Sequence, residues 1–173
     1  KKLSIYCTLS LLFFFSITPQ TYATKESKEV SILFLGDSLT EGYGIEKAKS
    51  YPMIAAEILK DKGHDIKVIN GSVSGSTTAS GTSRLKWFGK AKPDYVFLAL
   101  GGNDALRGIK VSSSKSNLTR TIKLAQEMDI KVLLAGVLAP PNYGQEYGKA
   151  FASMYLDLQK EFNIPTLPFF LEG

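Results

Sequence analysis

Cysteine and histidine are almost absent from this sequence, since each occurs once in 173 residues, as Cys7 and His64. With one cysteine and one histidine, the chain cannot contain a metal motif built from several of these residues. No block of lysines and arginines occurs, and a net charge of +5 is a weak signal for a polyanionic partner. No nucleotide-binding glycine motif follows the first predicted strand. We therefore expect no metal, no cofactor and no nucleic-acid partner.

Long apolar runs are also missing, apart from "LSLLFFFSI" near the N-terminus, which is too short for a comfortable membrane span. This run follows two lysines and precedes Thr21-Tyr22-Ala23, a pattern typical of a secretory signal peptide. We predict a signal peptide over residues 1–23, a single domain over 24–173, and a secreted or periplasmic bacterial protein. Cleavage would remove Cys7 and leave no cysteine. An uncleaved membrane anchor is the alternative.

Short apolar runs alternate with helical patterns over the rest of the chain. We predict strands at 30–35, 66–70, 94–100 and 131–137, and a fifth within 163–170. Helices are expected between them, one with an apolar stripe through Met53, Ile54 and Ile58, and one capped by Ser116 or Asn117. Such alternation indicates an α/β fold with one parallel sheet, for which the common strand order is 2-1-3-4-5.

Polar, glycine-rich segments follow the first three strands: Ser38 after the first, Asn70–Ser76 after the second and Gly101–Asp104 after the third. Since ligands bind at the carboxyl ends of parallel strands, where the strand order reverses, we expect these loops to share one crevice. Ser38 is a candidate nucleophile there. Backbone N–H groups of Gly75 and Ser38 and the side chain of Asn103 are candidate donors for an oxyanion. Taken one at a time, Gly75 and Asn103 also fit ordinary turn residues.

Three segments, "GDSLTEGYG", "NGSVSGSTT" and "LGGNDALRG", resemble the first three sequence blocks of the SGNH (GDSL-type) hydrolases. The similarity runs from about residue 30 to the end and is strongest to the secreted arylesterase, lysophospholipase and thioesterase branch. It implies a flavodoxin-like three-layer α/β/α sandwich and cofactor-free hydrolysis of acyl esters or thioesters. It also implies Ser38 as nucleophile, with the Gly75 N–H and Asn103 in the oxyanion hole.

The sequence departs from the family pattern in one respect, because a fourth block, Asp-x-x-His, is not found after the fifth predicted strand. His64 precedes the second strand, so a five-residue strand of about 16 Å separates it from the Ser38 end of the sheet. We therefore interpret His64 as a surface turn residue. Asp37 and Asp104 are expected to hold loops together rather than to act as bases.

Two explanations of the missing block stay open: a C-terminally truncated esterase, or a chain that has lost catalysis and only binds. We favour truncation, since without a further helix one apolar face of the sheet would lie partly bare. As printed, the chain is expected to be largely inactive.

The main hypothesis is a monomeric serine esterase for aryl, acyl or lysophospholipid esters or acyl thioesters. The alternatives are an inactive periplasmic binding module and a carbohydrate O-deacetylase. Leu106, Leu138 and Tyr143 are candidate substrate-binding residues.

Overall fold

The computed structural model describes residues 29–171, and the predicted signal peptide lies outside this range. The strands are β1 (Val30–Gly36), β2 (Ile66–Asn70), β3 (Tyr95–Ala99), β4 (Lys131–Ala135) and β5 (Thr166–Leu167). The α-helices are α1 (Ser38–Glu41), α2 (Tyr51–Asp61), α3 (Gly81–Phe88), α4 (Gly102–Leu106), α5 (Val111–Glu127) and α6 (Gln145–Phe162), and the 3-10 helices are η1 (Lys47–Lys49), η2 (Thr78–Ser80), η3 (Gly89–Ala91) and η4 (Pro141–Tyr143).

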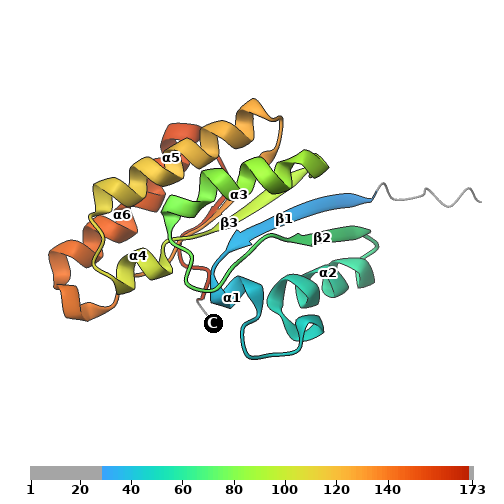
Figure 1. Ribbon diagram of the computed structural model, residues 1–173, viewed down its shortest axis with the longest axis horizontal. Helices are drawn as coiled ribbons and strands as arrows, with labels where there is room; N and C mark the ends of the chain where they lie inside the picture. Colours follow the sequence, from blue (N-terminus) through green and yellow to red (C-terminus); the bar gives the residue numbers. More distant parts are fainter. Residues whose placement is uncertain (1–28, 172–173) are drawn as a thin grey trace, which may run out of the picture.

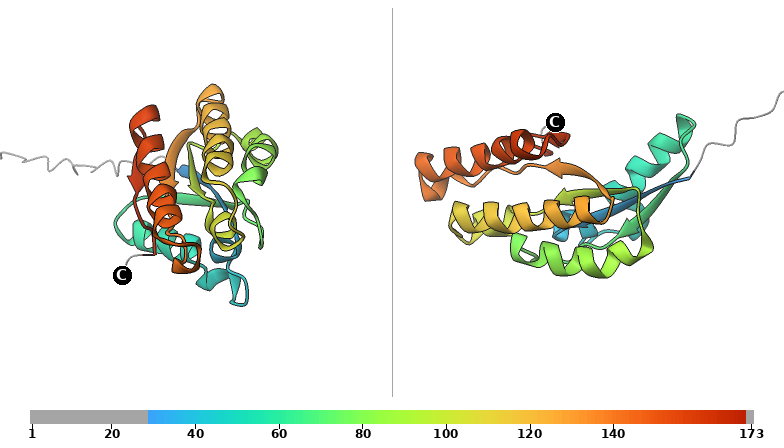
Figure 2. Two further views of the ribbon diagram at one scale, coloured as in Figure 1. Left: turned by 90° about the vertical axis from the view of Figure 1, so that its left-hand side faces the viewer. Right: turned by 90° about the horizontal axis from the view of Figure 1, so that it is seen from above.

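The five strands form one parallel sheet in the order β2-β1-β3-β4-β5, which confirms the predicted fold class and order (Figure 1). Helices α3, α5 and α6 cover one face (Figure 2). The core lies between this face and these helices, because every second strand residue points to it. Its largest fully buried side chains include Leu33, Leu35, Leu98, Leu134, Leu118, Ile122, Phe151, Tyr155 and Leu158.

Helix α2 covers the β1–β2 half of the other face. Its first residue, Tyr51, packs against Phe34 and Phe97, with ring centroids 6.0 and 6.1 Å apart. The predicted apolar stripe of this helix is only partly buried, since Met53, Ile54 and Ile58 are 43–50% exposed.

The β3–β5 half of that second face is more open. A hollow of about 240 Å³ lies over it, lined in part by Phe97, Leu133 and Leu167. Leu167, on the edge strand β5, is 52% exposed. None of the helices in residues 29–171 combines the length and hydrophobicity that a transmembrane span requires.

The first four strands agree with the predictions to within two residues at each end, and the fifth lies inside its predicted range, but one helix begins earlier than expected. Helix α5 begins at Val111, so Ser116 and Asn117 lie inside it and the predicted cap is wrong. The Asn117 side chain instead donates to Thr78 Oγ1 at 3.0 Å, a tertiary contact that sequence spacing does not reveal. Strand β5 has only two residues. Prolines stand on either side of it, at 165 and 168, and they lack the N–H that would extend its pairing.

Candidate active site

Ser38 lies at the carboxyl end of strand β1, where it begins the short helix α1. Gly36 is required just before it, because a Cβ at this position would overlap the Thr40 side chain. Asp37 caps α1, and its Oδ1 accepts a hydrogen bond from the Leu39 N–H at 3.1 Å. The Ser38 side chain is half-buried, and its Oγ makes no hydrogen bond to any residue from 29 to 171. Among the described residues, the hydroxyl therefore has no hydrogen bond that a substrate would have to break.

The loop after β2 carries Gly75 in a tight turn. The Ser76 N–H donates to the Val73 carbonyl at 3.1 Å, and Gly75 has a φ of +76°, a conformation that favours glycine. Gly75 is exposed, and its N–H has no acceptor in the described part of the chain. This N–H is consequently free to bind a ligand.

Asn103 lies in the first turn of α4, after β3, and it joins the other two loops. Its Nδ2 donates to Asp37 Oδ2 at 3.3 Å and to the Ser76 carbonyl at 3.0 Å. Asp37 and Ser76 are the chain neighbours of Ser38 and Gly75. The three predicted loops are thus brought together at one end of the sheet, where Figure 1 shows α1, α4 and the β2–α3 loop.

Asp104, the neighbour of Asn103, connects α4 to the β2–α3 segment and to helix α5. It is fully buried, and its carboxylate accepts bonds from the Thr78 N–H at 2.8 Å, Thr78 Oγ1 at 2.5 Å and Ser114 Oγ at 2.9 Å. The expectation that Asp37 and Asp104 hold the loops together is confirmed by these bonds. Burial raises the pKa of Asp37, and the nearby charge of Asp104 adds to the effect.

Helix α6 and the turn before it tie the Asn103 segment to the core through tyrosine hydroxyls. Tyr155 donates to the Leu100 carbonyl at 3.0 Å, and Tyr147 donates to the Ile109 carbonyl at 2.8 Å. Tyr143 is one of the candidate substrate-binding residues, and it donates to the carbonyl of another, Leu106, at 2.9 Å. These two residues therefore lie together.

The third candidate substrate-binding residue, Leu138, follows strand β4. It is 51% exposed, compared with 65% for Leu106 and 40% for Tyr143. All three therefore offer apolar surface to solvent rather than filling the core.

Three charged residues around the β2–α3 loop were not predicted from the sequence. Glu41 accepts two hydrogen bonds from Ser74, Arg84 donates twice to the Gly71 carbonyl, and Arg107 donates to the Gly75 carbonyl at 3.1 Å. The only available signal was the place of Glu41 three residues after Ser38, which puts both on one face of a helical turn.

His64 is exposed and precedes β2, while Ser38 follows β1. Because β1 and β2 are parallel, with Val30 opposite Ile66, the histidine lies at the other end of the sheet. The interpretation of His64 as a surface turn residue is confirmed.

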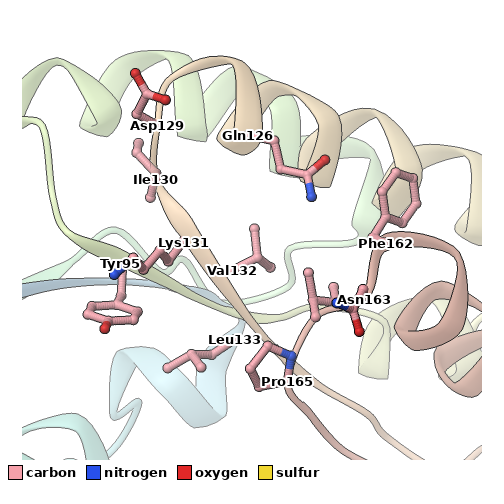
Figure 3. Close-up of a pocket in the computed structure, with 11 residues that line it drawn as sticks. Tyr95, Gln126, Asp129, Ile130, Lys131, Val132, Leu133, Phe162, Asn163 and Pro165 are labelled. Carbon is pink, nitrogen blue, oxygen red and sulfur yellow. The ribbon is translucent and has the colours of Figure 1, made fainter.

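A hollow of about 610 Å³ also lies away from Ser38, at the amino ends of β3 and β4 (Figure 3). Its walls include Tyr95, Lys131 and Phe162, and none of the predicted site residues lines it. No group of three or more histidine, cysteine, aspartate or glutamate side chains within residues 29–171 is placed to hold a metal ion.

Comparison with known proteins identifies the family. The model of the GDSL-like Lipase/Acylhydrolase family matches residues 34–172. An arylesterase of Vibrio mimicus is 38% identical over 165 residues, covering 95% of this chain and 80% of the relative. Esterase TesA of Pseudomonas aeruginosa is 36% identical over 151 residues, covering 87% and 75%. The solved structure of AlinE4, an SGNH-hydrolase family esterase, superposes with a TM-score of 0.80 at 38% identity, covering 84% of this chain and 78% of that one. The chain therefore belongs to the GDSL-like lipase/acylhydrolase family.

Proposed function

We propose that this protein is a serine esterase that forms an acyl intermediate on Ser38. The observation that carries the proposal is the double hydrogen bond of Asn103, which holds the segments of Ser38 and Gly75 side by side. These segments carry a serine hydroxyl and a glycine N–H that have no hydrogen-bond partner within residues 29–171. Family membership supports the same chemistry.

In the proposed reaction, Ser38 Oγ attacks the carbonyl carbon of the ester and loses its proton to a base. The N–H groups of Gly75 and Ser38 stabilise the resulting oxyanion, and each such donor is worth about 3 kcal/mol. Asn103 supplies a further donor. Its two N–H groups are engaged in the free protein, so the oxyanion would replace the longer bond, the one to Asp37. The protonated base gives its proton to the departing alcohol or thiol, which leaves acyl-Ser38. Water then attacks this intermediate, releasing the carboxylic acid and restoring the Ser38 hydroxyl.

A base for Ser38 is not supplied by His64, which lies at the opposite end of the sheet. Nor does Asp37 suit this role, because its carboxylate already accepts bonds from Leu39 and Asn103. We expect added imidazole, which can take the proton from Ser38, to accelerate ester hydrolysis by this polypeptide. A Ser38→Ala variant gives the background rate of imidazole alone.

The relatives are named arylesterase, esterase and thioesterase/lysophospholipase, and we propose the same substrate range of aryl and acyl esters or thioesters. Leu106, Leu138 and Tyr143 would contact the acyl or aryl group. With the predicted signal peptide, a secreted or periplasmic location follows as part of the proposal.

The test is covalent labelling of the full-length gene product by a fluorophosphonate, read by intact mass. One adduct is expected, located on Ser38 by peptide mapping and absent from Ser38→Ala. A folded protein that takes up no label and hydrolyses no p-nitrophenyl acetate, with or without imidazole, would refute the esterase.

A further inference from the structure

Glu41 and Ser74 form a clamp between two of the site loops, although they are 33 positions apart in the chain. Glu41 ends the helix that Ser38 begins. Its Oε2 accepts bonds from the Ser74 N–H at 2.7 Å and from the Ser74 hydroxyl. Hydrogen bonds to a carboxylate are about twice as strong as neutral ones. The segment of the nucleophile is thus tied directly to the residue that precedes Gly75.

Fixing Ser74 also fixes the Gly75 N–H, because the peptide plane that carries it begins at the Ser74 carbonyl carbon. The turn is held on its other side by Arg107 at the Gly75 carbonyl and by Asn103 at the Ser76 carbonyl. The Gly75 N–H itself is left without an acceptor in the described chain. Its direction is therefore set by its neighbours, with no bond of its own to be broken by a substrate.

We propose that Glu41 is a positioning residue for ester hydrolysis, whose carboxylate holds Ser74 so that the Gly75 N–H points at the oxyanion. This inference rests on the proposed function of Ser38 and Gly75. Glu41 does not touch the reacting atoms, so its effect passes through the loop. Displacement of a catalytic donor by about 1 Å costs up to 10²-fold in rate.

The charges around Glu41 agree with this role. Hydrogen bonds from Ser74 lower the pKa of Glu41, and the positive charges of Arg84 and Lys47 lower it further. Arg84 meanwhile donates to the Gly71 carbonyl at the start of the same loop. The clamp is accordingly ionised at neutral pH, where its hydrogen bonds are strongest.

The test compares the Ser38-dependent kcat and KM of the full-length gene product with those of Glu41→Ala and Glu41→Gln. Glu46→Ala is the matched control, because the Glu46 side chain is 74% exposed and its one ion pair within residues 29–171 is with the nearby Lys49. We expect Glu41→Ala to lower kcat about tenfold or more with KM within twofold. Glu41→Gln, which keeps an acceptor oxygen, should restore most of kcat, and the control should match the wild type. A kcat within twofold of wild type in folded Glu41→Ala overturns the proposal.

Two further measurements test the role of Glu41 if the Glu41→Ala variant does not fold or if the wild type has no esterase activity. If Glu41→Ala does not fold, Ser74→Ala is used instead, because it removes only the hydroxyl bond to Glu41. A loss of about threefold or more in kcat then supports the proposal, and an unchanged kcat overturns it. If the wild type hydrolyses no ester, the proposed function fails, but positioning is still tested by NMR. Glu41→Ala should then shift the Gly75 amide resonance and speed hydrogen exchange at the Ser74 amide. Unchanged signals overturn the role of Glu41.

Discussion

Replacement of Asn103 by alanine separates its structural from its catalytic contribution. The substitution deletes the bonds to the Ser76 carbonyl, at 3.0 Å, and to Asp37 Oδ2, at 3.3 Å. A neutral hydrogen bond contributes about 1 kcal/mol net, and a bond to a charged acceptor somewhat more. Because Asn103 is half-buried, water replaces part of the loss, and we expect unfolding to become easier by about 1–2 kcal/mol.

The catalytic loss should be larger. An oxyanion donor is worth about 3 kcal/mol, so kcat should fall about 10²-fold while KM changes little. The assay is p-nitrophenyl acetate hydrolysis at a temperature where both proteins are folded, with the Ser38→Ala rate subtracted. Asn142→Ala, the same change at an exposed residue of η4, is the control. A kcat for Asn103→Ala within threefold of wild type would show that this amide only ties the loops together.

Three stability predictions accompany this one. Asp104→Ala leaves buried donors of Thr78 and Ser114 unpaired. Urea titration should show that the free energy of unfolding falls by about 3 kcal/mol or more. A fall of less than about 1 kcal/mol would contradict a stabilising role for these bonds. Tyr155→Phe removes the bond to a buried carbonyl and should cost about 1–2 kcal/mol by the same measurement, whereas an unchanged midpoint would count against it. Burial raises the pKa of Asp37 in the folded protein. The contribution of Asp37 to folding stability is therefore fully favourable below its ordinary pKa of about 3.9, and it is lost as the pH rises through the pKa of the folded state. Asp37→Asn should therefore gain stability relative to wild type as pH increases through that window, and a difference that is flat between pH 3 and 7 would argue against the shift.

The order of the strands and the end of the sheet that carries the site were predictable from local patterns. Short apolar runs alternating with helices indicate a parallel sheet, and the polar segments after the first three runs must then emerge at one edge. The placement of His64 away from Ser38 follows from the same reasoning. Boundaries were less predictable. The start of α5 was misplaced because neither predicted cap acts as one: Asn117 donates to the distant Thr78, and Ser116 accepts a bond from Arg120 one turn further along the helix.

The ties between the loops could not be obtained from the sequence. Glu41 accepts a hydrogen bond from Ser74, and Asn103 donates one to Ser76. Both bonds form only when the parallel sheet brings their segments close together. A motif names the residue types that a reaction needs, but it does not say which amide is engaged and which is left open.

Local sequence patterns were enough to predict the layered fold, the serine at the end of β1 and the glycine that permits a turn beside it, because these depend on hydrophobic periodicity and backbone freedom. How firmly the turn is held, and which hydrogen-bonding groups stay unsatisfied, depends on tertiary contacts. Those properties arise from contacts between residues tens of positions apart, which form only when the strands are brought side by side.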